Sequence, residues 1–332
     1  MGLSTSYAQK IQTQYGIGGN FARLYLVSWF GTADLSEEEV AQKLQDPTLK
    51  MWFDFAIQCI ARGRQTAQFV KPHLSSRASR YLDVGCGHGG FLVGFSELGL
   101  DVYGIDLNPQ FIIYSKANLK DHNLPEERAQ QGDILDPSLP ARLGRFDTIT
   151  CNDVIEHVND VPRALEHMTG MLAPAGVLAI QIPNKDYIGF VHRDGHYNLF
   201  GIVLLKHEQA KAYYDSLIKE EYGVGEYYEL GYYTKKLSEL GCETLNLPPI
   251  YPQKTVREEV QTLKQTLSTL IQFIRQKKGP FLGIKVAVTV RYFLYLAGLG
   301  WRGLLALFFK SRRAAFRARY LTDFWFMIAT KK

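Results

Sequence analysis

The chain has few cysteines, and it contains a long stretch without any acidic residue. Its four cysteines, Cys59, Cys86, Cys151 and Cys242, lie far apart and form no Cys-x-x-Cys pair. Neither a zinc site nor a disulfide framework is therefore indicated, and a reducing compartment is expected. No charge-free apolar run reaches the ~18 residues of a membrane-spanning helix. Residues 1–6 lack the basic and apolar regions of a signal peptide, so we expect a cytoplasmic protein.

The acid-free stretch lies between Val260 and Thr322 and contains twelve Lys and Arg residues. Because the whole chain carries a net charge of only +5, the remainder is acidic on balance. Residues 280–309 are strongly apolar and resemble an amphipathic helix. At ~100° per residue, one arc of this helix gathers the basic and tyrosine side chains, and the bulky aliphatic side chains lie mostly outside it. The arc consists of Lys285, Thr289, Arg291, Tyr292, Tyr295 and Arg302. We expect Gly298 and Gly300 to break the helix, and a second helix to begin at Trp301.

A basic face opposite a bulky apolar face is typical of a helix that lies in a membrane interface. We therefore predict that residues 251–322 bind an anionic membrane surface. The alternative is that the apolar face packs on the rest of the protein or forms a homodimer interface, with the basic side in water. Nucleic acid is a less suitable partner, because the segment is dominated by aliphatic residues.

A glycine-rich turn follows the first apolar run, in the pattern Asp83-x-Gly85-x-Gly87. The next apolar run ends in Asp106, 21 residues after Gly85. This is the pattern of a nucleotide-binding βαβ unit, in which glycines allow close approach of a ligand and an acidic residue accepts both ribose hydroxyls. Asp83 would repel a pyrophosphate, whereas it suits a ligand that carries an ammonium and a sulfonium group.

These residues resemble the first motifs of the class I, Rossmann-like S-adenosylmethionine-dependent methyltransferases. The resemblance implies an α/β fold with a doubly wound, seven-stranded sheet whose last strand is antiparallel. It implies that S-adenosylmethionine is the cofactor and that Asp133 and Ile134 lie beside the adenine. It also places Asn152, at the end of the fourth strand, next to the methionine moiety. The cofactor-binding residues that we predict are Asp83, Gly85, Gly87, Asp106, Leu107, Asp133, Ile134 and Asn152.

Residues just after the fourth strand carry the candidate catalytic groups. The spacing Asp153-x-x-Glu156-His157 is similar to the cluster of the ubiquinone-biosynthesis O-methyltransferases, where it is associated with a divalent metal. His157 titrates near neutrality and is the best candidate for a general base, with Glu156 beside it. Three ligand-capable groups on one loop suit Mg²⁺ or Zn²⁺, yet a Glu-His pair also occurs without metal, and we favour no metal. His196 is the second catalytic candidate.

We expect four parts of the chain. They are an N-terminal helical lid (1–77), a cofactor-binding core (78–250), a basic helical insertion between the sixth and seventh strands (251–322) and the final strand (323–332). The function that we predict is methyl transfer to a hydrophobic or lipid-linked small molecule, at oxygen, by an enzyme peripheral to a membrane. The alternatives are a non-catalytic cofactor-binding scaffold and a nucleic-acid methyltransferase. The second lacks the Asn/Asp-Pro-Pro-aromatic stretch of exocyclic-amine enzymes.

Overall fold

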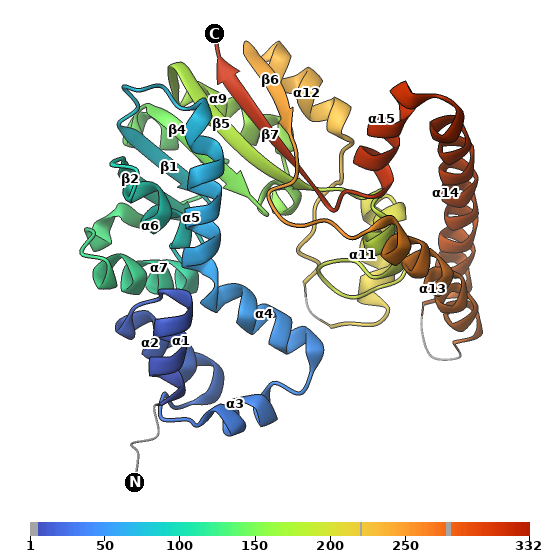
Figure 1. Cartoon of the computed structure of the whole chain (residues 1–332), viewed down its shortest axis with the longest axis horizontal. Coiled ribbons are helices and arrows are strands. Elements are labelled where there is room, and N and C mark those ends of the chain that lie inside the picture. The colour runs from blue at the N-terminus through green and yellow to red at the C-terminus, as the bar shows by residue number, and fades with distance from the viewer. Residues whose placement is uncertain (1–5, 220, 277–279) are drawn as a thin grey trace.

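A twisted sheet forms the centre of the computed structural model, which describes residues 6–219, 221–276 and 280–332 (Figure 1). The prediction that the N-terminus carries no signal peptide is not tested by the structure, because residues 1–5 lie outside the described residues. Within the described residues the sheet has seven strands in the order β3-β2-β1-β4-β5-β7-β6. The strands are β1 (Arg80–Val84), β2 (Asp101–Asp106), β3 (Ala129–Gln131), β4 (Phe146–Asn152), β5 (Leu172–Pro183), β6 (Cys242–Leu247) and β7 (Phe324–Lys331). β7 runs antiparallel to β5 and β6, and the pairs among β1 to β5 are parallel, which confirms the predicted topology.

Helices cover both faces of the sheet, as the alternation of side chains along each strand requires. In β1, Leu82 and Val84 face one core and Tyr81 faces the other. The first core lies under α8 (Leu139–Leu143), α9 (Val161–Gly170) and α12 (Leu230–Glu239). The second lies under α5 (Cys59–Val70), α6 (Gly90–Ser96) and α7 (Pro109–Asp121). Since both faces are covered, the polar groups of the fold concentrate at the carboxyl ends of the strands.

The N-terminal helices form a separate cluster at the end of α7 and α5. They are α1 (Tyr7–Tyr15), α2 (Gly19–Phe30), α3 (Glu37–Lys43) and α4 (Pro47–Ile57). Ser36 caps α3 in a reciprocal pair with Glu39, as the sequence around it suggests. Phe21 and Tyr25 pack into this cluster together with Tyr114 of α7, so these aromatic side chains serve the core of the cluster.

The backbones of α5 and α6 approach each other so closely that only glycine fits between them. A Cβ atom on Gly63 would lie 2.0 Å from the carbonyl oxygen of Gly90, and one on Gly90 would lie 2.2 Å from that of Cys59. This contact fixes α5 against the turn that follows β1, because α6 begins at the end of that turn. The residues of α5 that face the turn are therefore held in one position.

The insertion between β6 and β7 consists of α13 (Val256–Arg275), α14 (Leu282–Phe308) and α15 (Lys310–Tyr320). It packs on α10 (Ile188–His192) and α11 (His207–Asp215) through a fourth apolar core (Figure 1). The expected break at Gly298 and Gly300 is wrong, because α14 continues to Phe308 and the chain bends at Phe309 instead. A Cβ atom on Gly298 would lie 3.4 Å from the hydroxyl oxygen of Tyr320, an ordinary contact distance, so a larger residue than glycine also fits there.

The sequence predicted the two faces of α14 but not which of them packs on the protein. The tyrosine face is buried against the protein, with Tyr292 0% and Tyr295 8% exposed, whereas Leu294 on the aliphatic face is 67% exposed. The alternative in which the apolar face packs on the protein and the basic side is in water is therefore wrong. Among the basic residues of this face, Arg291 bonds the Leu204 carbonyl and Gln209, so its charge is satisfied within the fold.

The buried side-chain amide of Asn184 forms several hydrogen bonds between the end of the central sheet and the insertion. The side chain of Asn184, directly after β5, donates to the carbonyl oxygens of Ala318, Arg319 and Thr322 at the end of α15. Arg319 also forms an ion pair of 2.7 Å with Asp186. These contacts satisfy carbonyl groups that the last turn of a helix leaves without partners, and they hold the insertion at the end of β5.

We predict that Gly63→Ala lowers the free energy of unfolding by at least ~2 kcal/mol, because the added methyl group has only backbone to displace. Gly231→Ala in α12 is the matched control, since no atom lies within 4 Å of the added carbon. It should be neutral or stabilising by up to ~1 kcal/mol. Urea unfolding measures both variants, and equal stabilities would contradict the close contact of α5 with α6.

Candidate active site

A cavity of about 720 Å³ opens at the carboxyl ends of β1, β2, β4 and β5. It contains every residue that the sequence analysis selected for the site. The cofactor-binding candidates Asp83, Gly85, Gly87, Asp106, Leu107, Asp133, Ile134 and Asn152 line it, as do Glu156, His157 and His196. Asp83 and His196, 113 positions apart in the sequence, thus meet in one space, which has room for more than one small molecule.

The turn after β1 is shaped by hydrogen bonds to the neighbouring strand. The backbone N–H groups of Gly85 and Cys86 both donate to the carbonyl oxygen of Ile105, at 2.8 and 2.9 Å. Gly85 has φ +74°, and a Cβ atom there would lie 2.2 Å from Val154. Only glycine satisfies both conditions. The turn therefore brings bare backbone to the cavity wall.

Asp83 is buried at the end of β1, 3% exposed, behind this turn. It accepts a hydrogen bond of 2.6 Å from the hydroxyl of Thr150 in β4, which in turn lies 2.5 Å from the hydroxyl of Tyr81. Burial raises the pKa of Asp83 to about 7, and the nearby carboxyl group of Asp106 acts in the same direction. A cationic ligand in the cavity would favour the ionised form of this carboxyl group.

Two further acidic residues stand at the ends of β2 and β3. The carboxylate of Asp106 accepts from the backbone N–H groups of Gly87 and Asn108, each at 2.9 Å, so its orientation is fixed by the turn. Asp133 accepts from the N–H of Leu135 at 2.8 Å. Each carboxylate oxygen has a second lone pair, which leaves acceptor capacity for a ribose or an adenine amino group.

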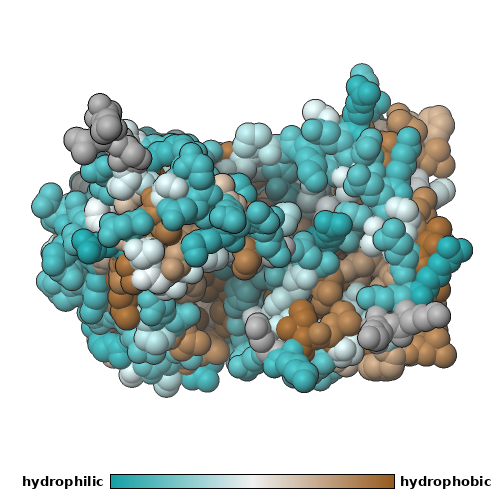
Figure 2. Space-filling model, turned by 90° about the horizontal axis from the view of Figure 1, so that it is seen from below, coloured by the Kyte–Doolittle hydropathy of each residue, from teal (hydrophilic) through white to brown (hydrophobic). Residues whose placement is uncertain are grey.

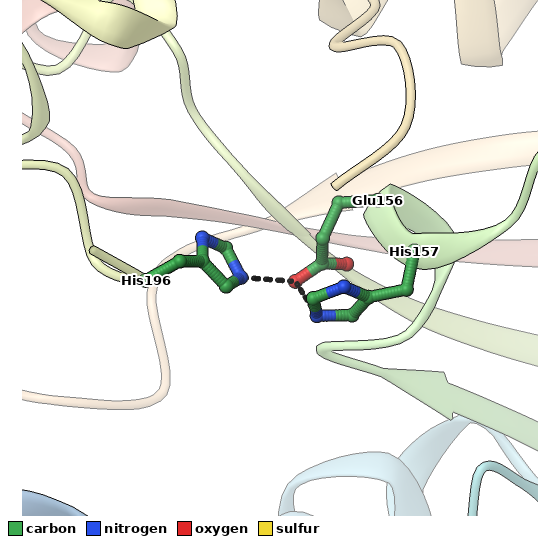
Figure 3. A group of neighbouring side chains, drawn as sticks. All are labelled: Glu156, His157 and His196. Atoms are coloured by element: carbon green, nitrogen blue, oxygen red, sulfur yellow. Dashed lines mark ion pairs between the residues drawn. The ribbon is translucent and has the colours of Figure 1, made fainter. Parts of the chain in front are cut away.

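The loop after β4 carries Glu156 and His157 (Figure 3). Glu156 is 3% exposed, and burial together with the neighbouring Asp153 raises the pKa of its carboxyl group well above the ordinary value. Residues 223–225 hold the loop from the other side. The N–H of Gly225 bonds the carbonyl oxygen of Glu156 at 2.6 Å, and Nδ1 of His157 lies 2.7 Å from the carbonyl oxygen of Gly223.

His196 reaches the same point from the segment after α10. The buried carboxylate of Asp194 accepts from the N–H groups of His196, Tyr197 and Leu199, which makes a tight loop. The ring of His196 then stands at 84° to that of His157, with 4.9 Å between centroids. Its Nε2 lies 4.0 Å from Oε1 of Glu156, and Nε2 of His157 lies 3.9 Å from the same atom (Figure 3).

The donor atoms of Glu156, His157 and His196 lie within 4.8 Å of one another, which is close enough for a shared metal ion. The sequence pattern selected Asp153 as the third member of this group. Asp153 instead accepts a hydrogen bond of 2.8 Å from Gln181 of β5. The candidate ligand set of the structure is therefore one carboxylate and two imidazoles, with His196 in place of Asp153.

Arg62 of α5 also lines the cavity, and the sequence analysis did not select it. Its guanidinium lies 3.3 Å from the centre of the Phe55 ring and donates to the Phe55 carbonyl oxygen at 3.0 Å. Its Nε atom is buried without a hydrogen-bond partner, and burial lowers its pKa. An isolated Arg in a helix before the first strand gives no recognisable signal, since only the contact of α5 with the glycine turn brings it here.

Four of the eleven buried side-chain polar atoms without partners among the described residues belong to residues that line this cavity. They are both side-chain polar atoms of Asn152, Nε of Arg62 and Oε2 of Glu156. Because such atoms cost free energy unless a partner satisfies them, they indicate a polar ligand. An amino-acid moiety would satisfy Arg62 and Asn152, and the remaining acceptor capacity of Asp106 and Asp133 suits a ribose and an adenine. The site thus fits S-adenosylmethionine.

We predict that binding of S-adenosylhomocysteine weakens ~10-fold between pH 8 and pH 6. With a pKa of about 7, the ionised fraction of Asp83 falls by that factor, and the ligand ammonium prefers the ionised form. Calorimetry at several pH values measures the change. Asp83→Asn is the control and should bind weakly at both values; a wild-type affinity that is independent of pH would show that Asp83 does not contact the ligand charge.

Comparisons with known proteins agree with this geometry. The model of a methyltransferase domain family matches residues 56–247. A ubiquinone biosynthesis O-methyltransferase from Rhodopseudomonas palustris (strain BisB5) is 34% identical over 112 residues, which are 33% of this chain and 42% of that enzyme. The chain spans about half the length of the curated relatives that it matches.

Two solved structures are also similar. The YcgJ protein from Bacillus subtilis is 12% identical with a TM-score of 0.46, over 81% of this chain and 98% of that one. CalS10 from Micromonospora echinaspora, an amino pentose methyltransferase with bound S-adenosylmethionine, is 26% identical with a TM-score of 0.31, over 37% and 50% of the two chains. The family match covers more than half of the chain, and the site fits S-adenosylmethionine. The chain belongs to the class I S-adenosylmethionine-dependent methyltransferases.

Proposed function

We propose that this enzyme transfers a methyl group to a hydroxyl oxygen of a lipophilic small molecule, with His157 as the general base. Bound S-adenosylmethionine supplies the methyl group from its sulfonium. The protein has to hold the acceptor in line with that group, exclude water and remove the hydroxyl proton. The observation that supports the proposal best is the pair of differently bonded histidines on either side of Glu156.

The hydrogen bond of His157 defines which ring nitrogen carries the hydrogen when the ring is neutral. A carbonyl oxygen can only accept, so the Nδ1 atom that faces Gly223 carries the hydrogen. In the neutral ring, Nε2 then has a free lone pair, and this atom is the one nearer to Glu156. The side chain is 40% exposed, so it exchanges its proton with water readily. His157 is thus in the correct tautomer for a general base.

His196 has the opposite arrangement. Its Nδ1 lies 3.2 Å from the hydroxyl of Tyr227, which can donate to it, and Nε2 then carries the hydrogen. Burial and the nearby His157 lower the pKa of His196 to about 3, so the ring is uncharged at neutral pH and is a poor base. We therefore assign His196 the role of a hydrogen-bond donor to the acceptor oxygen, with Glu156 beside it.

The acceptor region of the cavity is aromatic. Trp52 and Phe55 of α4 line it on the lid side, and Phe190, Tyr251 and Phe324 line it on the insertion side. Such surfaces suit a planar or aliphatic acceptor more than a sugar or a nucleotide. Since Trp52 is 39% and Phe55 37% exposed at the mouth, the N-terminal helices 1–77 would act as the lid of an apolar entrance.

The basic insertion supports a place at a membrane. We propose that the enzyme is cytoplasmic and binds an anionic membrane surface through residues 251–322, because each basic residue near such a surface contributes about 1 kcal/mol. Among the described residues of the acid-free stretch, the exposed basic side chains are Lys264, Arg275, Arg302, Lys310, Arg312, Arg313 and Arg317. A lipophilic acceptor is concentrated in the same place. The ubiquinone biosynthesis enzymes among the relatives are compatible with an acceptor of this kind.

Replacing His157 by Ala should lower the rate of methyl transfer ~10²- to 10⁴-fold while leaving the affinity for S-adenosylhomocysteine near that of the wild type. The measurement uses labelled S-adenosylmethionine and fractionated membrane lipids as acceptors. His73→Ala is the matched control, since His73 lies outside the cavity lining. Unchanged transfer in His157→Ala would exclude it as the base. If a chelator abolished transfer and Mg²⁺ restored it, metal activation by Glu156, His157 and His196 would replace the base mechanism.

Arg62→Gln should weaken S-adenosylhomocysteine binding ~10- to 100-fold, because the change removes the half-buried cation that we propose holds the carboxylate of the methionine moiety. Arg64→Gln is the control two residues away, where the side chain pairs with Glu97 on the surface. It should leave the affinity unchanged. If Arg62→Gln kept the cofactor affinity but raised the KM of the acceptor, the guanidinium would instead contact an anionic acceptor.

A further inference from the structure

The exposed face of α14 is apolar from one end of the helix to the other. Leu282, Val286, Val290, Leu294, Trp301 and Phe308 are between 52% and 76% exposed. At ~100° per residue they fall within an arc of about 120°. Figure 2 shows hydrophobic side chains gathered along the edge of the molecule where α14 lies. By length and composition alone, α14 is the one helix among the described residues that could cross a membrane.

The opposite face holds α14 against the protein. Tyr292 bonds Thr266 of α13, and Tyr295 donates to the carbonyl oxygen of Asp186 at 3.0 Å. Ile284 and Val288 are fully buried beside them, in one core with α10 and α11. These contacts extend from the first turns of the helix to its middle. A rotation or removal of α14 would expose this core, so the helix keeps its apolar face outward.

A second apolar stripe runs along α13. Val256, Val260, Leu267, Ile271 and Ile274 are between 45% and 56% exposed and fall within an arc of about 60°. Lys264 and Arg275 lie at the edge of this stripe. Most of the apolar surface of the insertion is thus bordered by cationic side chains, since Lys310, Arg312 and Arg313 follow α14 and are exposed.

We infer that the apolar faces of α13 and α14 embed in the hydrocarbon layer of one leaflet of an anionic membrane, and that this burial, more than charge, retains the enzyme there. Side chains of this size on a charge-free stripe match acyl chains, and the bordering cations match lipid phosphates. A second copy of the chain is a poorer occupant, because it would bring the same exposed cations, among them Lys310, Arg312 and Arg313, against those of the first. The inference rests on the proposed function in so far as the acceptor is lipophilic.

Because the insertion is bonded to the end of β5, the orientation of its helices relative to a membrane also sets the orientation of the active site. Asn184 and Asp186 follow β5 directly and bind the end of α15, and Phe324, at the start of β7, lines the cavity. A membrane that holds α14 therefore also fixes the direction in which the cavity mouth faces. The leaflet acts as a positioning surface for the acceptor as well as an anchor for the protein.

Co-sedimentation of the full-length protein with vesicles tests the inference. Vesicles of phosphatidylcholine alone and vesicles containing phosphatidylserine are compared at low and high salt. Because apolar insertion is insensitive to screening, the wild type should bind both kinds at high salt.

Leu294→Asp combined with Phe308→Asp should lower that binding at least ~10-fold. Arg312→Gln combined with Arg313→Gln should lower only the low-salt binding to anionic vesicles, ~10- to 30-fold. Ile113→Asp, an equally polar change at an exposed site on α7, is the control and should bind as the wild type does.

Tryptophan fluorescence measures how deeply α14 enters the bilayer. Trp301, 62% exposed on the apolar face, should be quenched by brominated acyl chains, and this quenching should be lost in Trp301→Phe. A wild type that remains in the supernatant with both kinds of vesicle would overturn the inference. So would a dimer, seen by sedimentation, that the two Asp substitutions dissociate. Calorimetry with S-adenosylhomocysteine separates the proposals: protein that binds this ligand but no vesicles contradicts only the membrane surface.

Discussion

The site depends first on the backbone contact between α5 and α6. Two helices rarely approach with carbonyl groups against Cα atoms, and here the approach places the side chains of α5 directly beside the turn that follows β1. Arg62 is aimed into the cavity because of it, and Phe55 is held beneath the guanidinium. The N-terminal helices pack in turn on α7 and α5. The N-terminal helices, the cationic group and the glycine turn are therefore parts of one packed arrangement.

The local patterns of the sequence predicted the parts of the site that belong to strand ends. Asp83, Asp106 and Asn152 lie at or near the ends of apolar runs, and strand ends of a doubly wound sheet meet at one edge, so the order of these runs was enough to bring them together. Asp133 follows polar residues, and its position in the site was predicted from the family resemblance. The antiparallel seventh strand was predicted from the same resemblance.

Contacts between residues far apart in the sequence determined the position of Arg62 and the orientation of α14, which the sequence did not show. Arg62 has no motif, and its position follows from glycines 63 and 90, which lie far apart in the chain. Helical periodicity separated the two faces of α14 correctly but contained no information on which face would meet protein. The tyrosines decided it, because their hydroxyls find partners in Thr266 and Asp186, which a leaflet of acyl chains cannot offer. Glycine propensity suggested a break in α14 at Gly298 and Gly300, but the helix continues through both residues to Phe308.

The insertion has an inner side that the core of the enzyme requires and an outer face that it does not. On the inner side, Asn184 gathers three carbonyl groups, Tyr187 bonds Glu259 of α13, and the apolar core is shared with α10 and α11. Within the described residues, the outer faces of α13 and α14 make no such contacts, so their residues could change while the contacts with the sheet stay the same. One methyl-transfer core could therefore be directed to different membranes or different acceptors by changing only this outer surface.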